Sequence, residues 1–190
     1  MKRHLLTIGL VALAATSLPA CKAPGATKDA KRGAIMRMHD EALERATHKW
    51  PHLDNMIDES HGYAVVNGGV LKAFFVGLSS GYGVVVDQNQ RTHTMIDTFA
   101  LSLGPGFELS NTNGIVVFHS KEGLELAKKG ELGWVFGGTA GLGIEVGDLG
   151  GDWAIAGVSG ATTSFRDMRW GLGIHAQFFG MDADLNEYLE

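Results

Sequence analysis

Helical periodicity dominates the first part of the chain. An apolar stripe at three- and four-residue spacing is formed by Ile35, Met38, Ala42 and Ala46, with Leu43 beside them. Thr27 or Asp29 is a candidate N-cap, and Trp50-Pro51 ends the pattern because proline disfavours helix at the residue before it. The spacing predicts a helix over 29–49 and a second, short helix over 53–60.

The pattern changes to short apolar segments after His61. These segments are rich in β-branched and aromatic residues and predict strands near 62–66, 73–78, 82–86, 92–100, 106–109, 114–118, 134–140, 144–146, 153–158 and 170–178. Asp87–Gln90 is a good hairpin turn. Within 170–178 apolar side chains alternate with glycine or polar ones, which predicts one buried face formed by Trp170, Leu172, Ile174, Ala176 and Phe178.

One helix interrupts the predicted strands. Ser120 is its N-cap, Glu122 lies in its first turn, Lys128 and Lys129 lie in its last turn, and Gly130 suits the left-handed closing position. We therefore expect an α+β fold, with N-terminal helices, a mostly antiparallel twisted sheet or partial barrel, and one further helix near 120–129.

The first twenty residues have the organisation of an export signal. Lys2 and Arg3 form a positive start, and the apolar run 5–15 is too short for a spanning helix. The sequence Leu-Pro-Ala-Cys at 18–21 resembles the bacterial lipobox, in which the cysteine is acylated and becomes the mature N-terminus. We expect a signal over 1–20, acyl chains on Cys21, and a short tether over 21–28.

Cys21 is the only cysteine of the chain, so an internal disulfide is excluded. An ordinary secretory signal that leaves a free N-terminal cysteine is the alternative to acylation. Lys22 follows the cysteine, and by the usual Gram-negative sorting rule this favours the outer membrane, with the protein facing the periplasm.

The remaining chain suits one domain, consisting of a helical arm over 29–60 and a sheet body over 61–190. Its 27 glycines in 190 residues are about twice the usual share. Residues 21–50 carry a net charge of +3 and residues 51–190 carry −10. Such an acidic body excludes a typical nucleic-acid-binding domain, whereas the basic arm could lie against anionic lipid headgroups.

Motifs for catalysis are missing from the sequence. It contains no phosphate-binding loop, no dinucleotide fingerprint and no nucleophile elbow. His48 and His52 are four residues apart, but Pro51 lies between them and spoils a shared helical face. We expect no enzyme activity, no cofactor and no metal site, although a folded pocket could gather histidines with Asp97 or Asp152.

Five segments in order over about 130 residues resemble the SYLF domain family, a lipid-binding module of eukaryotic actin-patch proteins and bacterial lipoproteins. They are Gly62–Val66 with Val70–Gly77, Gly81–Val86, Leu103–Glu108 with Gly114–Phe118, the helix ending at Gly130, and Trp170–Gln177 with Asn186–Tyr188. Phe74 departs from the family, which usually has glycine there, and so does Asn67, where bacterial members often have proline.

The resemblance implies lipid binding through a basic N-terminal helix. The candidate lipid-binding residues are Lys31, Arg32, Arg37, Arg45, Lys49 and Lys72. The expected partner is an anionic phospholipid, and any protein partner stays unknown. A lipid-anchored protein-interaction module is the rival interpretation, and it predicts an exposed apolar or aromatic patch on the sheet. A small outer-membrane β-barrel would need about 8 spanning strands, and the helix capped by Ser120 weighs against it.

Overall fold

A computed structural model describes residues 22–130, 135–145, 149–155 and 158–187, with side chains for 22–130 (except Glu108 and Thr112) and for 178–187. The predicted signal and Cys21 lie outside the described residues. The elements are α2 (Lys28–Lys49), α3 (His52–Asp58), β1 (Gly62–Asp87), β2 (Thr92–Phe118), α4 (Lys121–Lys129), β3 (Val135–Glu145), β4 (Leu149–Ile155), β5 (Val158–Met181) and α5 (Ala183–Asn186). The expected α+β class is confirmed. None of the described helices is both long and apolar enough to cross a membrane.

The five strands that the structure describes form one antiparallel sheet. β1 pairs with β2, and β2 pairs with β5. β3 and β4 share the other edge of β5, with β3 along its second half and β4 along its first. β1 and β2 make a single long hairpin whose turn follows Asp87, as the sequence predicted.

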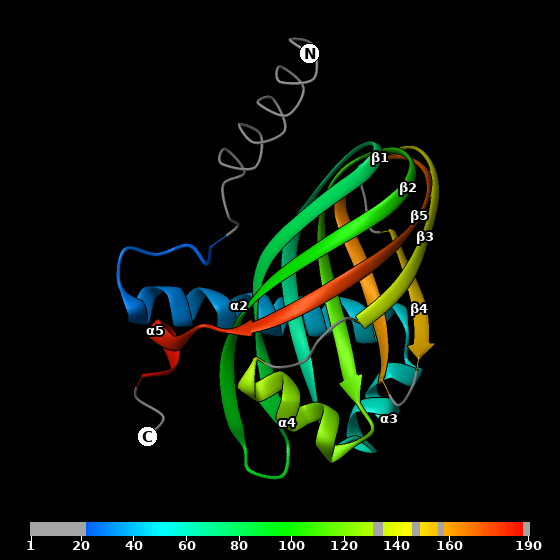
Figure 1. The fold of residues 1–190 in the computed structure, drawn as a ribbon. Coiled ribbons are helices and arrows are strands. Elements are labelled where there is room, and N and C mark those ends of the chain that lie inside the picture. The colour runs from blue at the N-terminus through cyan, green and yellow to red at the C-terminus, as the bar shows by residue number, and fades with distance from the viewer. Residues whose placement is uncertain (1–21, 131–134, 146–148, 156–157, 188–190) are drawn as a thin grey trace.

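The long strands bend sharply across the middle of the sheet. The ladder between β1 and β2 is irregular between Phe74 and Val76, and the ladder between β2 and β5 skips Gly104 and Pro105. Gly104 and Gly106 have φ values of 138° and 150°, which favour glycine over any residue with a side chain. The bend lies at the upper end of Figure 1, away from α3 and α4.

Glycine is needed where the two halves of β1 approach each other. A Cβ atom at Gly81 would lie 2.0 Å from the carbonyl oxygen of Asn67, and one at Gly83 would lie 2.4 Å from that of Val65. Neither oxygen can move without displacing a strand. Close backbone contact therefore accounts for part of the high glycine content.

The ends of α2 and α4 agree with the prediction to within one residue, whereas α3 covers His52–Asp58 and ends two residues before the predicted end at Ser60. The Thr27 hydroxyl accepts a hydrogen bond from the amide of Ala30 at 3.2 Å, which identifies Thr27 as the N-cap of α2. The Ser120 hydroxyl accepts from the amide of Gly123 at 3.2 Å, and Gly130 closes α4 with φ 69°.

Two hydrophobic clusters cover opposite faces of the part of the sheet that lies below the bend in Figure 1, which we call the lower half. Val65, Val84 and Ile115 pack with Ile35, Met38 and Ala42 of α2, together with Leu53 and Ile57 of α3. The residues that follow these three along the strands, namely Val66, Val85 and Val116, pack on the other side with Leu124 and Ala127 of α4. Strands in this half are therefore buried on both faces, and both clusters draw on the same strands.

Two features of the sheet differ from the prediction. Short strands were expected, but the glycine, serine and asparagine residues expected to break them remain within continuous strands of 26 residues in β1 and 27 in β2. The second difference concerns the face of β5. Phe178, expected to be buried, is 41% exposed, whereas Phe179 is fully buried in the cluster beneath α4. The other residues of that predicted face, and Trp134, lie outside the described side chains.

Candidate functional site

The structure does not gather the six candidate lipid-binding residues into one surface. Lys31 and Lys49 are 18 residues apart on α2, which corresponds to about 27 Å along a helix. Arg32 is turned toward its own domain, where its Nε donates to the carbonyl oxygen of Leu185 at 2.7 Å. Arg45 lies 3.9 Å from Glu41, and Lys49 lies 5.1 Å from the centre of the Trp50 ring.

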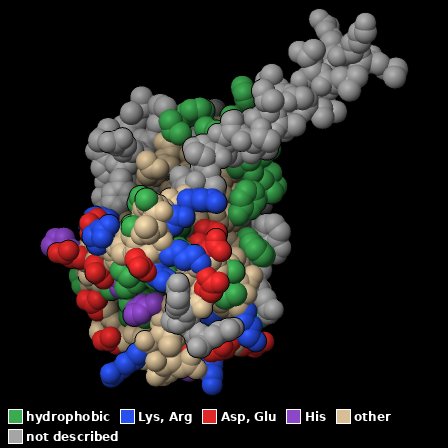
Figure 2. Space-filling model, turned by 90° about the vertical axis from the view of Figure 1, so that its left-hand side faces the viewer, with side chains coloured by type: hydrophobic (Ala, Val, Ile, Leu, Met, Phe, Trp, Pro, Cys, Tyr) green, Lys and Arg blue, Asp and Glu red, His purple; other side chains and the backbone are tan. Residues whose placement is uncertain are grey.

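The exposed part of α2 is more acidic than basic. Its exposed charged side chains are Asp29, Arg37, Asp40, Glu41, Glu44 and Lys49. Figure 2 accordingly shows acidic and basic side chains interspersed over the described part of this face. The positive charge counted over residues 21–50 is thus dispersed in space, because several basic residues pair with acids or with backbone carbonyls.

Lys72 lies on β1, two residues before the irregularity at Phe74 that marks the bend of the sheet. Its side chain is buried, with 3% of the residue exposed. The register places Lys72 opposite Glu108 of β2, and Glu108 opposite Arg169 of β5. Three ionisable residues therefore occupy one row across three strands. Because Lys72 is buried, its side chain is not exposed for contact with a lipid headgroup.

A polar contact joins α2 to β1 within the core. His39 Nε2 lies 3.0 Å from the hydroxyl of Tyr63, the two rings are stacked at 5.7 Å, and His39 Nδ1 lies 2.8 Å from Asp40. Burial, together with the nearby Asp40 carboxylate, raises the pKa of Tyr63. His39 and Tyr63 are both buried, so this contact fastens the helix to the sheet within the core.

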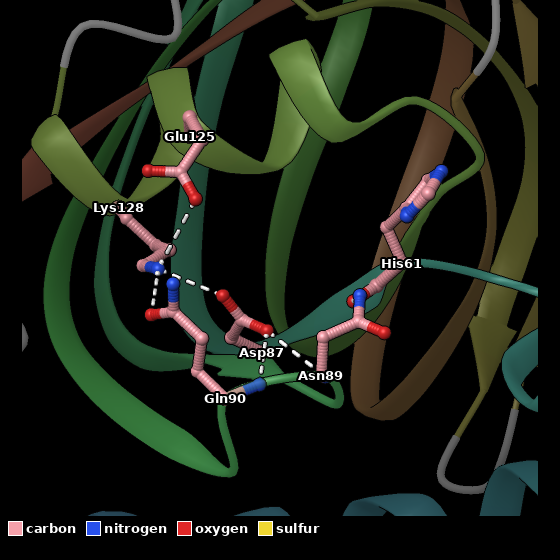
Figure 3. A network of polar contacts seen from close by, with 6 residues as sticks. All are labelled: His61, Asp87, Asn89, Gln90, Glu125 and Lys128. Carbon is pink, nitrogen blue, oxygen red and sulfur yellow. Dashed lines mark hydrogen bonds and ion pairs between the residues drawn. The ribbon is translucent and has the colours of Figure 1, made fainter.

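A second polar network ties α4 to the hairpin turn (Figure 3). The Lys128 ammonium group donates to Asp87 at 2.7 Å, to Gln90 at 3.0 Å and to Glu125 at 3.3 Å. Burial would raise the pKa of Asp87, but hydrogen bonds from Lys128 and from the amides of Gln90 and Asn89 outweigh it and lower that pKa. Burial would lower the pKa of Lys128, but its hydrogen bonds to Asp87 and Glu125 outweigh that effect and raise the pKa.

Asn186 fastens the end of the described chain to the sheet. Its side-chain oxygen accepts from the amide of Met95 at 2.8 Å, and its side-chain nitrogen donates to the carbonyl of Met95 at 2.7 Å. The same side chain thereby satisfies both backbone groups of Met95. This structural role accounts for Asn186, one of the residues on which the family resemblance rests.

Sequence reasoning missed an exposed apolar surface at the bend. We call it the bend surface and define it by its exposed residues Leu71, Phe74, Phe75, Val76, Leu103, Phe107 and Leu109. Phe74 is 81% exposed and Phe75 is 67% exposed. The available signal was the uncharged aromatic pair in 73–80, for which only a strand over 73–78 was predicted.

Among the described residues no three histidine, cysteine, aspartate or glutamate side chains are close enough together to hold a metal ion. The chain was also compared with known proteins. A scan against protein-family models finds no match, and neither does a search of curated proteins.

Proposed function

We propose that this protein is a lipid-anchored component of the cell envelope, with a SYLF-like domain that acts at the membrane surface by binding lipid or by scaffolding, and not by catalysis. Acyl chains on Cys21 would attach it to the periplasmic leaflet of the outer membrane. The lipobox-like residues 18–21 and the family resemblance support this proposal.

The position of Ala23 is the observation that carries the proposal furthest. Ala23 is buried and belongs to the same hydrophobic cluster as Ile35 and Leu185. Part of the segment expected to be a tether over 21–28 therefore packs against the domain, two residues after the predicted acylation site. With so few residues between them, acyl chains on Cys21 would hold the folded domain directly against the bilayer.

Binding of anionic headgroups by α2 receives weaker support. Arg37 and Lys49 are its exposed basic residues, and four exposed acidic side chains surround them on the same helix. Any electrostatic attraction would therefore be modest, and salt at physiological concentration would screen it further.

A lipid-anchored protein-interaction module is the second candidate. It is favoured by the bend surface, since an exposed apolar patch on the sheet is what this interpretation predicts. The two candidates differ in one respect that can be measured, namely whether the domain has affinity for pure lipid once the acyl chains are absent.

Acylation is tested by growing cells that express the full chain with a clickable fatty acid. We expect label on the wild-type protein and none on Cys21→Ser. Inhibition of lipoprotein signal peptidase should leave the wild-type chain as a larger precursor. An unlabelled wild-type protein would overturn the lipid anchor.

Lipid affinity is tested by flotation of a form that lacks residues 1–20 and carries Cys21→Ser. Neutral and anionic vesicles are compared, and Arg37→Gln with Lys49→Gln removes the exposed basic charges of α2. Substitution is preferable to deleting α2, because six of its residues are buried. Flotation with neither vesicle type would favour the protein-interaction module.

A further inference from the structure

The polar and apolar positions near the bend are reversed relative to a water-exposed sheet. Leu71, Phe107 and Leu109 are 40% to 52% exposed, whereas Lys72 and Ser110 are 3% and 4% exposed. Apolar side chains thus lie outside and polar ones inside. In a water-exposed antiparallel sheet the apolar face is the buried one, and the opposite arrangement is typical of strands that face lipid.

The same alternation continues across the sheet in register. Ala73 lies opposite Phe107 of β2. In the same row across the strands, Phe107 lies opposite Trp170 of β5, and Trp170 lies opposite Leu142 of β3. In a second row, Leu71 lies opposite Leu109 of β2, Leu109 opposite Met168 of β5, and Met168 opposite Ile144 of β3. The polar positions Lys72, Glu108 and Arg169 form the row between these two. The apolar rows therefore extend in register over four strands, and the reversal of exposure is seen on β1 and β2, where the side chains are described.

Phe74 is held in an unfavourable backbone conformation. Its φ angle is 60°, in the left-handed region that is costly for a residue with a side chain, because the Cβ atom lies too close to the following carbonyl oxygen. Glycine would avoid that cost, yet the position carries a phenylalanine that is 81% exposed. No burial within the described part of the chain offsets the strain, which points to a role for the ring outside the molecule.

A bilayer fits the bend surface better than a protein does. Residues 73–80 and 98–107 contain no charged residue and no histidine. Protein interfaces usually surround an apolar centre with a polar rim and form about one hydrogen bond per 100–200 Å². The exposed side chains here are phenylalanine, leucine and valine, which form no hydrogen bonds.

The dimensions also suit one leaflet of a membrane. From Phe99, which is 47% exposed, to Leu103 the strand rises about 13 Å at 3.3 Å per residue. One leaflet contributes about 15 Å of the hydrocarbon thickness. The bend surface could therefore enter the outer part of a single leaflet, while the charged lower half of the domain stays in water.

We propose that the bend surface inserts into the headgroup–acyl boundary of a lipid bilayer, with Phe74 and Phe75 deepest. This inference rests on the proposed function for the nearness of the membrane. Insertion adds a second attachment point to Cys21 and so fixes the orientation of the domain. It requires no net charge on the lipid, in contrast to headgroup binding by α2.

The test uses the full acylated chain, in which Cys21 is the only native cysteine and is blocked by lipid. Phe75→Cys places an environment-sensitive fluorophore on the bend surface, and Glu122→Cys places the same fluorophore on α4, whose exposed first turn lies far from the bend (Figure 1). Both labelled proteins are reconstituted into vesicles of neutral phosphatidylcholine, with or without lipid carrying a spin label on its acyl chain. Leu103→Cys provides a second bend position.

Labels at 75 and 103 should show blue-shifted emission and lose most of their fluorescence to the spin-labelled lipid, while the label at 122 shows neither effect. Equal, weak quenching at all three positions would overturn the proposal. So would a label at 75 that is shielded in cells but unquenched in pure lipid, because that result identifies a protein partner. Labelling of the wild-type chain by the fluorophore reports a free Cys21, so failure of the anchor is recognised separately.

Discussion

The two halves of the β1–β2 hairpin are made of similar residues but meet different surroundings. In the lower half Val65, Val66, Val84 and Val85 alternate between two faces, and both faces are covered, one by α2 and α3 and the other by α4. At the bend the same alternation brings Leu71 and Phe107 to a face that no described helix covers. Whether an apolar residue of a strand is buried therefore depends on what packs against it, and not on its residue type alone.

The largest effect is expected from removing a covered aromatic ring. Phe118 is fully buried beneath α4, so Phe118→Ala should lower the free energy of unfolding by about 3–5 kcal/mol. Phe75→Ala, at 67% exposure on the bend, should change it by less than about 0.5 kcal/mol. Urea unfolding followed by circular dichroism compares the two. Equal losses would mean that the bend surface is covered in the folded protein and that the contrast between the halves is wrong.

A β-carbon between the two halves of β1 should cause the next largest effect. Gly81→Val places a side chain 2.0 Å from the backbone of Asn67, and we expect a loss of about 3 kcal/mol or failure to fold. Gly33→Ala on α2 is the control, because its nearest atom would be the Arg37 guanidinium at an ordinary 3.5 Å. That control should stabilise the helix by about 0.5–1 kcal/mol. Thermal unfolding measures both, and a neutral Gly81→Val would disprove the close approach.

Breaking the polar network in the covered half should have an intermediate effect that depends on pH. Asp87→Asn removes the carboxylate from Lys128 and should cost about 2 kcal/mol near neutral pH. The folded pKa of Asp87 is lowered from 3.8, so its contribution is complete above that value and disappears as pH falls through the folded pKa. For Lys128 the pKa is raised from 10.5, so its contribution disappears as pH rises through the folded pKa.

Urea unfolding at about pH 7 and about pH 3 measures this difference. The cost of Asp87→Asn should shrink at the lower pH. Lys129→Met changes the neighbouring, exposed lysine and should leave stability nearly unaltered at both values. A cost of Asp87→Asn that is independent of pH would contradict the electrostatic origin of the effect.

The smallest effect is expected at Phe74, and its sign is the informative part. Phe74→Gly relieves the left-handed backbone and should raise the free energy of unfolding by about 0.5–1 kcal/mol. The same substitution should weaken quenching of a label at position 103 by spin-labelled lipid. Arg91→Gly provides a matched control, since Arg91 has φ 56° in the hairpin turn at the other end and should change stability without changing the quenching. A destabilised Phe74→Gly would show that the ring packs within the molecule.

Local chemistry decided the helices, and they could be predicted well. Thr27 and Ser120 cap α2 and α4 because their hydroxyls reach amide groups only three residues away. Gly130 ends α4 because glycine tolerates the left-handed conformation. The apolar stripe from Ile35 to Ala46 likewise identified the buried face of α2, since helical spacing repeats within a few residues.

The candidate site could be predicted much less well. A count of basic residues over 21–50 correctly gave a positive arm, but it could not reveal that Arg32 is bonded to Leu185, a residue 153 positions away. Period-two alternation in β5 correctly predicted a strand, but it could not say which face was covered, and the outcome was reversed for Phe178 and Phe179. The bend surface was missed for the same reason.

The sequence by itself determined the α+β class, the helix ends and the hairpin turn after Asp87, because capping, turn and periodicity signals act between residues a few positions apart. The tertiary structure alone decided that short apolar segments join into long bent strands, that Lys72 is buried, and that Phe74 and Phe75 are exposed. Burial depends on which distant elements lie against a strand. That information resides in contacts between residues far apart in the chain, which no local pattern contains.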